Sequence, residues 1–167
     1  MDRDQLRALQ APLKDRYSER PQDALVTLRA QGTLGEGISC SIETGRAIVA
    51  AGLHPATGGD GSELCSGDML LEALAACAGV TLRAVSTSLG IGIDAGIVRA
   101  EGDLDFRGTL GVDPGAAVGF RAIRLRFELE SDADEEELAT LLKLTERYCV
   151  VLQTLTSSVD VSAELIG

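Results

Sequence analysis

A long apolar segment in the middle of the chain constrains the fold more than any other feature. Residues 69 to 82 read MLLEALAACAGVTL and hold a single charged residue, Glu72. A helix that is apolar on nearly every face must be covered by other elements. Ser66 suits an N-cap and Asp68 places a carboxylate in the first turn, so we predict a core helix running from Ser66 toward Leu89. The apolar run is shorter than the ~18 residues of a membrane span.

Two later segments alternate in the manner of β-strands. Apolar or small residues occupy every second position from Val98 to Phe106, and again from Ile123 to Leu129, with charged residues between them. The turn-forming sequence Asp113-Pro114-Gly115 lies between the two segments. This pattern predicts a hairpin with one buried face.

The chain before the central helix has weaker signals. Strand-like stretches around residues 26–28, 38–40 and 47–49, separated by glycine-marked turns that include residues 32–37, predict a three-stranded meander. The Gly- and Pro-rich segment from residue 54 to residue 62 predicts a loop. Residues 1–20 are expected to form a helical extension, although Pro12 should end or kink a helix that begins near Asp2.

The chain ends with a second helix and a strand in this interpretation. Acidic residues from Asp132 onward mark the start of the helix, and Cys149 lies near its far end. Its apolar stripe is Leu138, Leu141, Leu142 and Tyr148. Alternation from Val159 to Leu165 predicts a closing strand. We therefore expect residues 21–167 to form an α+β domain, with an antiparallel sheet packed on two central helices.

Charge limits the partners that such a domain can have. Asp and Glu total 26 against 15 Lys and Arg, a formal net charge of −11. This charge repels nucleic acid and anionic lipid, so neither is an expected partner. The N-terminus, Met1 to Asp4, is polar and lacks the apolar stretch of a secretory signal, which favours a cytoplasmic protein.

The four cysteines are Cys40, Cys65, Cys77 and Cys149. In a reducing cytoplasm a bridge between any two of them would be catalytic or sensing. No C-x-x-C pattern occurs and His54 is the single histidine, so we expect no metal site and no cofactor. We interpret His54 as a loop residue. Either Cys77 or Cys149, taken alone, is better explained as a small buried hydrophobe than as a functional thiol.

Taken together, two cysteine-containing segments are more specific. Residues 70–77, LLEALAAC, fit the pattern L-L-x-A-x-A-A-C, and residues 149–155, CVVLQTL, fit C-P-V-x-x-x-L except that Val150 replaces proline. With the order of predicted elements from Ala24 to the C-terminus, these segments resemble the OsmC and Ohr family, the osmotically induced and organic hydroperoxide resistance proteins.

The resemblance implies an OsmC-like fold and a thiol-dependent peroxidase that reduces organic hydroperoxides or hydrogen peroxide during stress. Cys77 would be the peroxidatic thiol, which attacks as a thiolate and becomes a sulfenic acid. Cys149 would be the resolving thiol, and a dithiol reductant would reset the pair. The family further implies an intertwined homodimer, with two sheets wrapped around paired central helices.

The chain departs from the family where the thiolate would be activated. Hydroperoxide-reducing members carry a glutamate ten positions before the first cysteine and pair it with an arginine, but this position is Gly67 here. Asp68 and Glu72 are the nearest carboxylates that could substitute. Both are also explained without function, Asp68 as a helix-start charge and Glu72 as a polar break in an apolar helix. Arg46 is better explained as a solvated charge than as the partner arginine.

Two functions therefore stay open at this point. One is the peroxidase with the Cys77 and Cys149 pair. The other is a non-catalytic OsmC-like domain that binds an apolar small molecule or senses oxidant by forming a disulfide. Cys65 is an alternative resolving thiol or a residue that fills space, and Cys40 fits a strand core.

Overall fold

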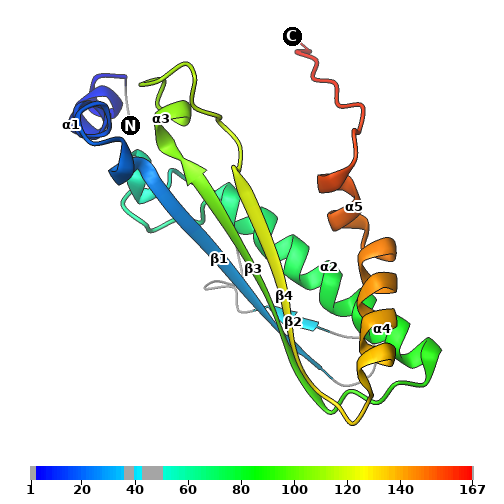
Figure 1. The fold of residues 1–167 in the computed structure, drawn as a ribbon. Coiled ribbons are helices and arrows are strands. Elements are labelled where there is room, and N and C mark those ends of the chain that lie inside the picture. Colours follow the sequence, from blue (N-terminus) through cyan, green and yellow to red (C-terminus); the bar gives the residue numbers. More distant parts are fainter. Residues whose placement is uncertain (1–2, 36–39, 43–50, 167) are drawn as a thin grey trace.

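A four-stranded antiparallel sheet forms one layer of the computed structural model, which describes residues 3–35, 40–42 and 51–166 (Figure 1). Its strand order is β2-β1-β3-β4. The strands are β1 (Leu25–Leu34), β2 (Cys40–Ile42), β3 (Ala95–Asp105) and β4 (Ala122–Glu130). Together with the helices on one side of this sheet, they confirm the predicted α+β class.

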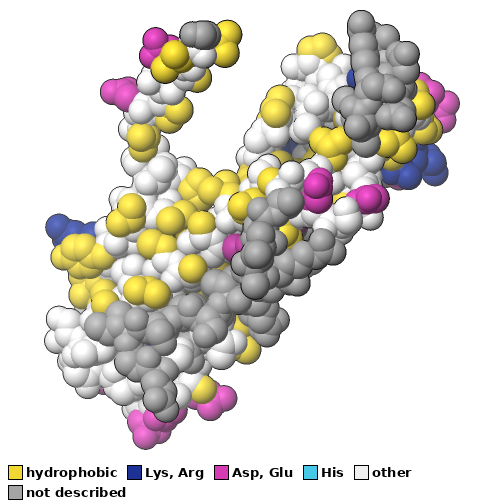
Figure 2. All heavy atoms as spheres, turned by 180° about the vertical axis from the view of Figure 1, so that it is seen from behind, with side chains coloured by type: hydrophobic (Ala, Val, Ile, Leu, Met, Phe, Trp, Pro, Cys, Tyr) yellow, Lys and Arg dark blue, Asp and Glu magenta, His cyan; other side chains and the backbone are white. Residues whose placement is uncertain are grey.

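The helices form the second layer. Helix α2 (Ser66–Leu89) runs along one face of the sheet, and α4 (Glu135–Tyr148) and α5 (Val150–Thr156) pack against α2. The other helical elements are α1 (Arg3–Glu19), α3 (Phe106–Thr109) and the 3₁₀ turns η1 (Pro21–Ala24) and η2 (Pro55–Thr57). Seen from behind, many apolar side chains remain at the surface over the helical layer (Figure 2).

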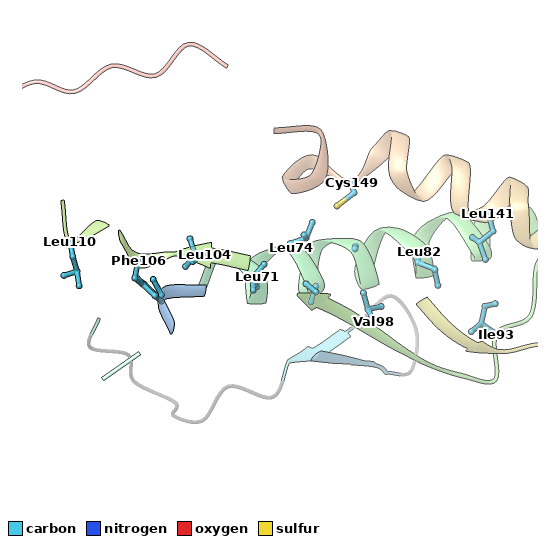
Figure 3. Close-up of a cluster of buried hydrophobic side chains, with 14 of the residues drawn as sticks. Leu71, Leu74, Leu82, Ile93, Val98, Leu104, Phe106, Leu110, Leu141 and Cys149 are labelled. Atoms are coloured by element: carbon cyan, nitrogen blue, oxygen red, sulfur yellow. The ribbon is translucent and has the colours of Figure 1, made fainter. Parts of the chain in front are cut away.

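The core lies between α2 and the sheet (Figure 3). Leu71, Leu74 and Leu82 of α2 are fully buried, as is Val98 of β3. Every second residue of β3 is buried, and β3 pairs with β4 as the predicted hairpin. By length and composition α2 could cross a membrane, but its buried leucines place it as the core helix of this fold.

The N-cap of α2 lies one residue earlier than we predicted. It is Cys65 instead of Ser66, and the Cys65 sulfur accepts a hydrogen bond from the Gly67 N–H at 3.4 Å. Asp68 lies in the first turn, as predicted. At the other end Gly90 has a φ of 73°, a left-handed conformation that glycine adopts without strain and that ends the helix after Leu89.

The predicted meander is confirmed only at its first pairing. Strands β1 and β2 pair antiparallel, but β1 continues through Gly32, where we expected a turn, because Gly32 pairs with Val98 on one side and with Ile42 on the other. Hydrogen bonds to neighbouring strands on both sides keep this segment extended. The third expected strand, at residues 47–49, lies outside the described residues.

Helix α1 continues past Pro12, so an end of the helix at this residue is wrong. Contacts on either side of Pro12 hold the helix on η2. The buried Tyr17 hydroxyl donates to the Ala56 carbonyl at 2.8 Å, and the Gln10 amide donates to the Thr57 carbonyl at 3.2 Å. Such tertiary contacts offset the ~3 kcal/mol that an interior proline costs. The domain boundary at residue 20 stays a prediction.

The second predicted helix is divided into two. Asp134 and Glu137 form a capping box that starts α4, and the helix stops at Cys149, whose ψ of 106° is not helical. Leu141 is buried, whereas Leu142 and Tyr148 are 41% and 57% exposed, so the predicted stripe was too wide. Only the narrow row through residues 138, 141, 145 and 149 turns toward the core.

The predicted closing strand does not form within this chain. From residue 158 to residue 166 the chain is extended, exposed and leads away from the sheet (Figures 1 and 2). Val161 and Leu165 are 89% and 97% exposed. We call this segment the C-terminal tail. Its residues alternate as in a strand, but α5 directs it away from the described strands.

Tyr17→Ala should lower the free energy of unfolding by about 3–5 kcal/mol, because it empties a fully buried site that anchors α1. Tyr17→Phe should cost about 1–2 kcal/mol, since the ring stays and the hydroxyl loses its bond to the Ala56 carbonyl and the one it accepts from Arg16. Urea unfolding measures both. Tyr148→Phe, at a largely exposed position, is the control and should change stability by less than about 0.5 kcal/mol. Equal stability of all four proteins would contradict this assignment.

Candidate functional site

The site is centred on Cys77, in the middle of α2. This residue is half-buried and lies on the part of α2 that faces the junction between α4 and α5. One helical turn away on α2 lie Ala73 and Val80, both exposed. The thiol is thus held on a rigid element and is still within reach of a second one.

Cys149 lies at the junction itself. It ends α4, is the N-cap of α5, and is fully buried. Its sulfur points toward α2 (Figure 3), its thiol is one of the groups that lower the pKa of Cys77, and both cysteines are free thiols. The structure therefore brings together the two cysteines that the sequence singled out.

The surroundings of Cys77 favour its thiolate. Burial acts to raise the pKa of this thiol, but hydrogen bonds to the sulfur outweigh burial and lower the pKa below its usual value. The donors, in order of effect, are the Val151 N–H, the Cys149 thiol, the Val150 N–H and the Thr81 hydroxyl. No side chain caps α5, so its first N–H groups are available to the sulfur.

Cys149 shows the opposite behaviour. Burial raises the pKa of its thiol, and the neighbouring Cys77 raises it further because two negative charges in contact repel. The two pKa values are thus shifted in opposite directions, so Cys77 ionises more readily than Cys149. This asymmetry makes Cys77 the better nucleophile and leaves Cys149 as a thiol.

The two carboxylates suggested as supports lie elsewhere. Asp68 is nine residues before Cys77, or roughly 14 Å along the helix axis. Burial raises the pKa of Asp68, and the charge that acts on it is that of His54. Burial also raises the pKa of Glu72, followed by repulsion from Asp68. Neither carboxylate is among the groups that shift the pKa of Cys77, and their supporting role stays a prediction.

His54 belongs to this second cluster at the start of α2. Its Nδ1 accepts a hydrogen bond from the Ala56 N–H at 3.0 Å, and its ring stacks on Phe106. Burial lowers the pKa of His54, while Asp68 acts weakly in the other direction. The ring is therefore a neutral loop residue that packs, as the sequence indicated, and it is remote from Cys77.

Cys65 cannot serve as an alternative resolving thiol within one chain. It precedes Cys77 by twelve residues, and the N-cap position of α2 puts the two roughly 18 Å apart along the helix axis. A disulfide needs Cα atoms closer than about 7 Å. The side chain of Cys40 and the whole of Arg46 lie outside the described residues.

Sequence reasoning missed the hydrogen-bond donors that act on Cys77. The N–H groups of Val150 and Val151 become available because the helix breaks at Cys149, and no glycine or proline marks that break. Thr81 was visible as the residue four positions after Cys77, the spacing that places two side chains on one helical face. Within the described chain, no cationic side chain contributes to the shift at Cys77.

Two hollows lie near these elements. A groove of about 600 Å³ runs between β4 and the α4–α5 pair and is lined mainly by apolar residues, among them Ile123, Leu125 and Leu152. A smaller cavity of about 360 Å³ lies at the start of α2, beside His54 and Cys65. Among the residues that the structure describes, no cluster of three or more His, Cys, Asp or Glu could hold a metal ion.

Comparison with known proteins agrees with this geometry. The sequence model of the OsmC-like protein family matches residues 59–164, which include both cysteines. The chain belongs to the OsmC-like family. No curated protein matches it.

Two solved structures share the OsmC-like fold. An OsmC-like hydroperoxide resistance protein from Jannaschia sp. CCS1 superposes with a TM-score of 0.64 at 14% identity, covering 86% of this chain and 95% of that one. An OsmC-like protein from Mycoplasma pneumoniae superposes with a TM-score of 0.54 at 21% identity, covering 78% and 84%. Because the sequence identities are only 14% and 21%, the structural similarity establishes the fold and nothing further.

Alkylation should distinguish the two thiols of this OsmC-like protein. Because its pKa is lowered, Cys77 should react with iodoacetamide faster than Cys149 at pH 7, and its rate should rise with pH to a plateau with a midpoint below ~8.5, the value of a free cysteine. Peptide mass spectrometry measures both sites, with Cys77→Ser as the control for assignment. Faster labelling of Cys149 would contradict the assigned roles.

Proposed function

We propose that this OsmC-like protein is a thiol peroxidase that uses Cys77 and Cys149 as its redox pair. The observation that supports this most directly is that the two thiols lie against each other at the α4–α5 junction and that their pKa values are shifted in opposite directions, down at Cys77 and up at Cys149. A nucleophilic thiolate beside a neutral thiol is the arrangement that a two-cysteine peroxidase needs.

The reaction follows from this arrangement. The Cys77 thiolate attacks the distal oxygen of a hydroperoxide, the O–O bond breaks, and the leaving alkoxide takes a proton and departs as an alcohol. Cys77 is then a sulfenic acid, oxidised by two electrons. The Cys149 sulfur attacks it, an S–S bond forms and water leaves. A dithiol reductant returns two electrons by thiol–disulfide exchange and regenerates both thiols.

The surroundings of the pair support an organic hydroperoxide as substrate. Ala73 and Val80, which lie one helical turn from Cys77 on either side, are apolar and exposed. Apolar surface favours an alkyl or aryl group over the small, strongly hydrated hydrogen peroxide. The hydroperoxide resistance protein from Jannaschia, which shares the fold, is consistent with this substrate class.

A second function is favoured by one observation. In the described part of the chain, hydrogen-bond donors act on Cys77 but no cation does, and Gly67 stands where a glutamate supports catalysis in hydroperoxide-reducing relatives. The same pair could then form a disulfide once, as an oxidant sensor, or the apolar groove of about 600 Å³ could bind a small molecule without chemistry. Slow or absent turnover with intact disulfide formation would identify the sensor.

We further propose that the protein is a cytoplasmic homodimer. Met69, Leu70 and Val80 of α2 are 37–39% exposed, which is high for the apolar side of a core helix. The C-terminal tail has alternating apolar residues and no strand of its own chain to pair with among the described ones. Strand β4 is an edge of the described sheet and borders the apolar groove. If the C-terminal tail of a partner subunit paired with the edge of β4, the apolar residues of the tail and the groove beside β4 would both be covered.

The peroxidase proposal is tested by hydroperoxide consumption with a dithiol reductant, comparing cumene hydroperoxide with hydrogen peroxide. Turnover should be faster with cumene hydroperoxide and should vanish in Cys77→Ser. Without reductant, Cys149→Ser should still consume about one equivalent, because the first step needs only Cys77, and should accumulate a sulfenic acid that dimedone traps.

The control for that assay is Cys65→Ser, which should turn over at the parent rate because Cys65 lies far from the pair. Consumption that persists in Cys77→Ser would refute the peroxidase assignment. No turnover in the parent protein would favour the sensing or binding domain.

Charges in the C-terminal tail should prevent dimerisation. Val161→Asp and Leu165→Asp place a charge on the apolar side of the tail, where the single chain leaves the residue exposed, so they should cost the monomer little and still remove the dimer. Light scattering at micromolar concentration should show the parent as a dimer and these variants as monomers. Ser162→Asp, on the opposite side of the tail, should stay dimeric; a monomeric parent would exclude this assembly.

A further inference from the structure

Two charged residues of α2, Glu72 and Arg83, lack a partner of opposite charge. Both are half-buried. The Arg83 guanidinium donates a hydrogen bond to the Ile93 carbonyl at 2.7 Å, but its Nε is buried without a partner. Burial raises the pKa of Glu72, and the other group that acts on it is the carboxylate of Asp68, not a cation. Among the described residues, neither Glu72 nor Arg83 forms an ion pair.

The positions of these two charges on α2 explain why they do not pair with each other. Arg83 follows Glu72 by eleven positions, which is about three turns and roughly 16.5 Å along the helix axis. After three turns the two residues lie on the same side of the helix, but they are too far apart for an ion pair. An anion and a cation separated in this way are complementary to the same two charges on a helix that runs in the opposite direction.

An apolar strip of α2 lies beside these charges. Its members follow one another at spacings of four, three and four, the pattern by which one helix packs against another: Met69, Ala73, Ala76 and Val80. We call these four residues the α2 seam. Met69 and Val80 are 37% and 39% exposed, and Ala73 is exposed as well. The seam therefore has room for a helix from a second chain.

We propose that the α2 helices of two copies of this protein pack antiparallel along the α2 seam, with Glu72 of each copy forming an ion pair with the partner's Arg83. The inference rests on the proposed homodimer and adds the register of its central contact. In a two-fold antiparallel pair, residues equally far before and after the axis lie opposite each other. The seam alone permits more than one register. The charges select the one whose axis lies midway between Glu72 and Arg83, at Cys77 and Ala78.

The same charges oppose a parallel arrangement. A parallel pair would place Glu72 beside the partner's Glu72 and Arg83 beside the partner's Arg83, and like charges that meet at an interface repel strongly. The antiparallel pair converts both contacts into attractions. It also brings the partner's helix to the side of α2 that holds Ala73 and Val80, so the apolar surface beside each Cys77 includes residues of both chains.

Charge reversal tests this register. Glu72→Arg gives each dimer two contacts between cations, and Arg83→Glu gives it two contacts between anions. Either variant alone should therefore raise the dissociation constant of the dimer about tenfold or more. The double variant Glu72→Arg with Arg83→Glu exchanges the signs and should dimerise within about threefold of the parent. Sedimentation velocity over a dilution series measures all four proteins.

A mixture of the two single variants separates the contact between chains from the stability of each chain. In a heterodimer of Glu72→Arg with Arg83→Glu, both contacts again join opposite charges. Native mass spectrometry of an equimolar mixture should therefore show more heterodimer than random association gives. A random distribution of dimers, or single variants that dimerise as tightly as the parent, would overturn the inference.

Lys143→Glu is the matched control. It reverses a charge at an exposed position on α4 and changes the net charge by the same amount as Arg83→Glu. Its dissociation constant should stay within about twofold of the parent value. A monomeric parent would refute the homodimer together with this inference. A dimeric parent whose affinity does not respond to the reversals would refute the register alone.

Discussion

The packing of α2 on the sheet is the interaction on which the rest of this structure depends. Three fully buried leucines, Leu71, Leu74 and Leu82, fix the helix against β1 and β3, and burial of each such side chain contributes about 1.5–3 kcal/mol. Their positions set the rotation of α2, and this rotation turns Cys77 toward the α4–α5 junction. The core and the thiol site are therefore two faces of one helix.

The negative charge of the whole protein opposes ionisation of Cys77. A chain with a net charge of −11 creates a field that opposes a further anion. Neutral hydrogen-bond donors beside the sulfur act at short range, so they lower the pKa of Cys77 despite the negative charge of the whole protein. The start of α5 supplies two of them because the helix stops and restarts at Cys149. A local break in secondary structure thus does what an added positive charge would do.

The sequence predicted best the features that depend on local pattern. The course of α2, the hairpin of β3 and β4, and the acidic start of α4 all follow from periodicity and capping, and they agree with the structure. The meeting of Cys77 and Cys149 was predictable only through the family resemblance, because no local signal relates residues so far apart. The break at Cys149 has neither glycine nor proline to mark it. The continuity of α1 past Pro12 and the course of the C-terminal tail depend on tertiary contacts, which outweigh local preference.

The central place of β1 has a consequence for how the folding unit is delimited. The family match begins at residue 59, whereas β1 spans Leu25–Leu34 and lies between β2 and β3 in the sheet. A fragment cut at the edge of the family match would lose β1, β2, α1 and η2 at once, and β3 would become a bare edge. The leucines of α2 would lose part of the surface that covers them. The region matched by the family model is therefore shorter than the region that must fold together. A gene fragment intended to fold must include β1 as well as the matched region.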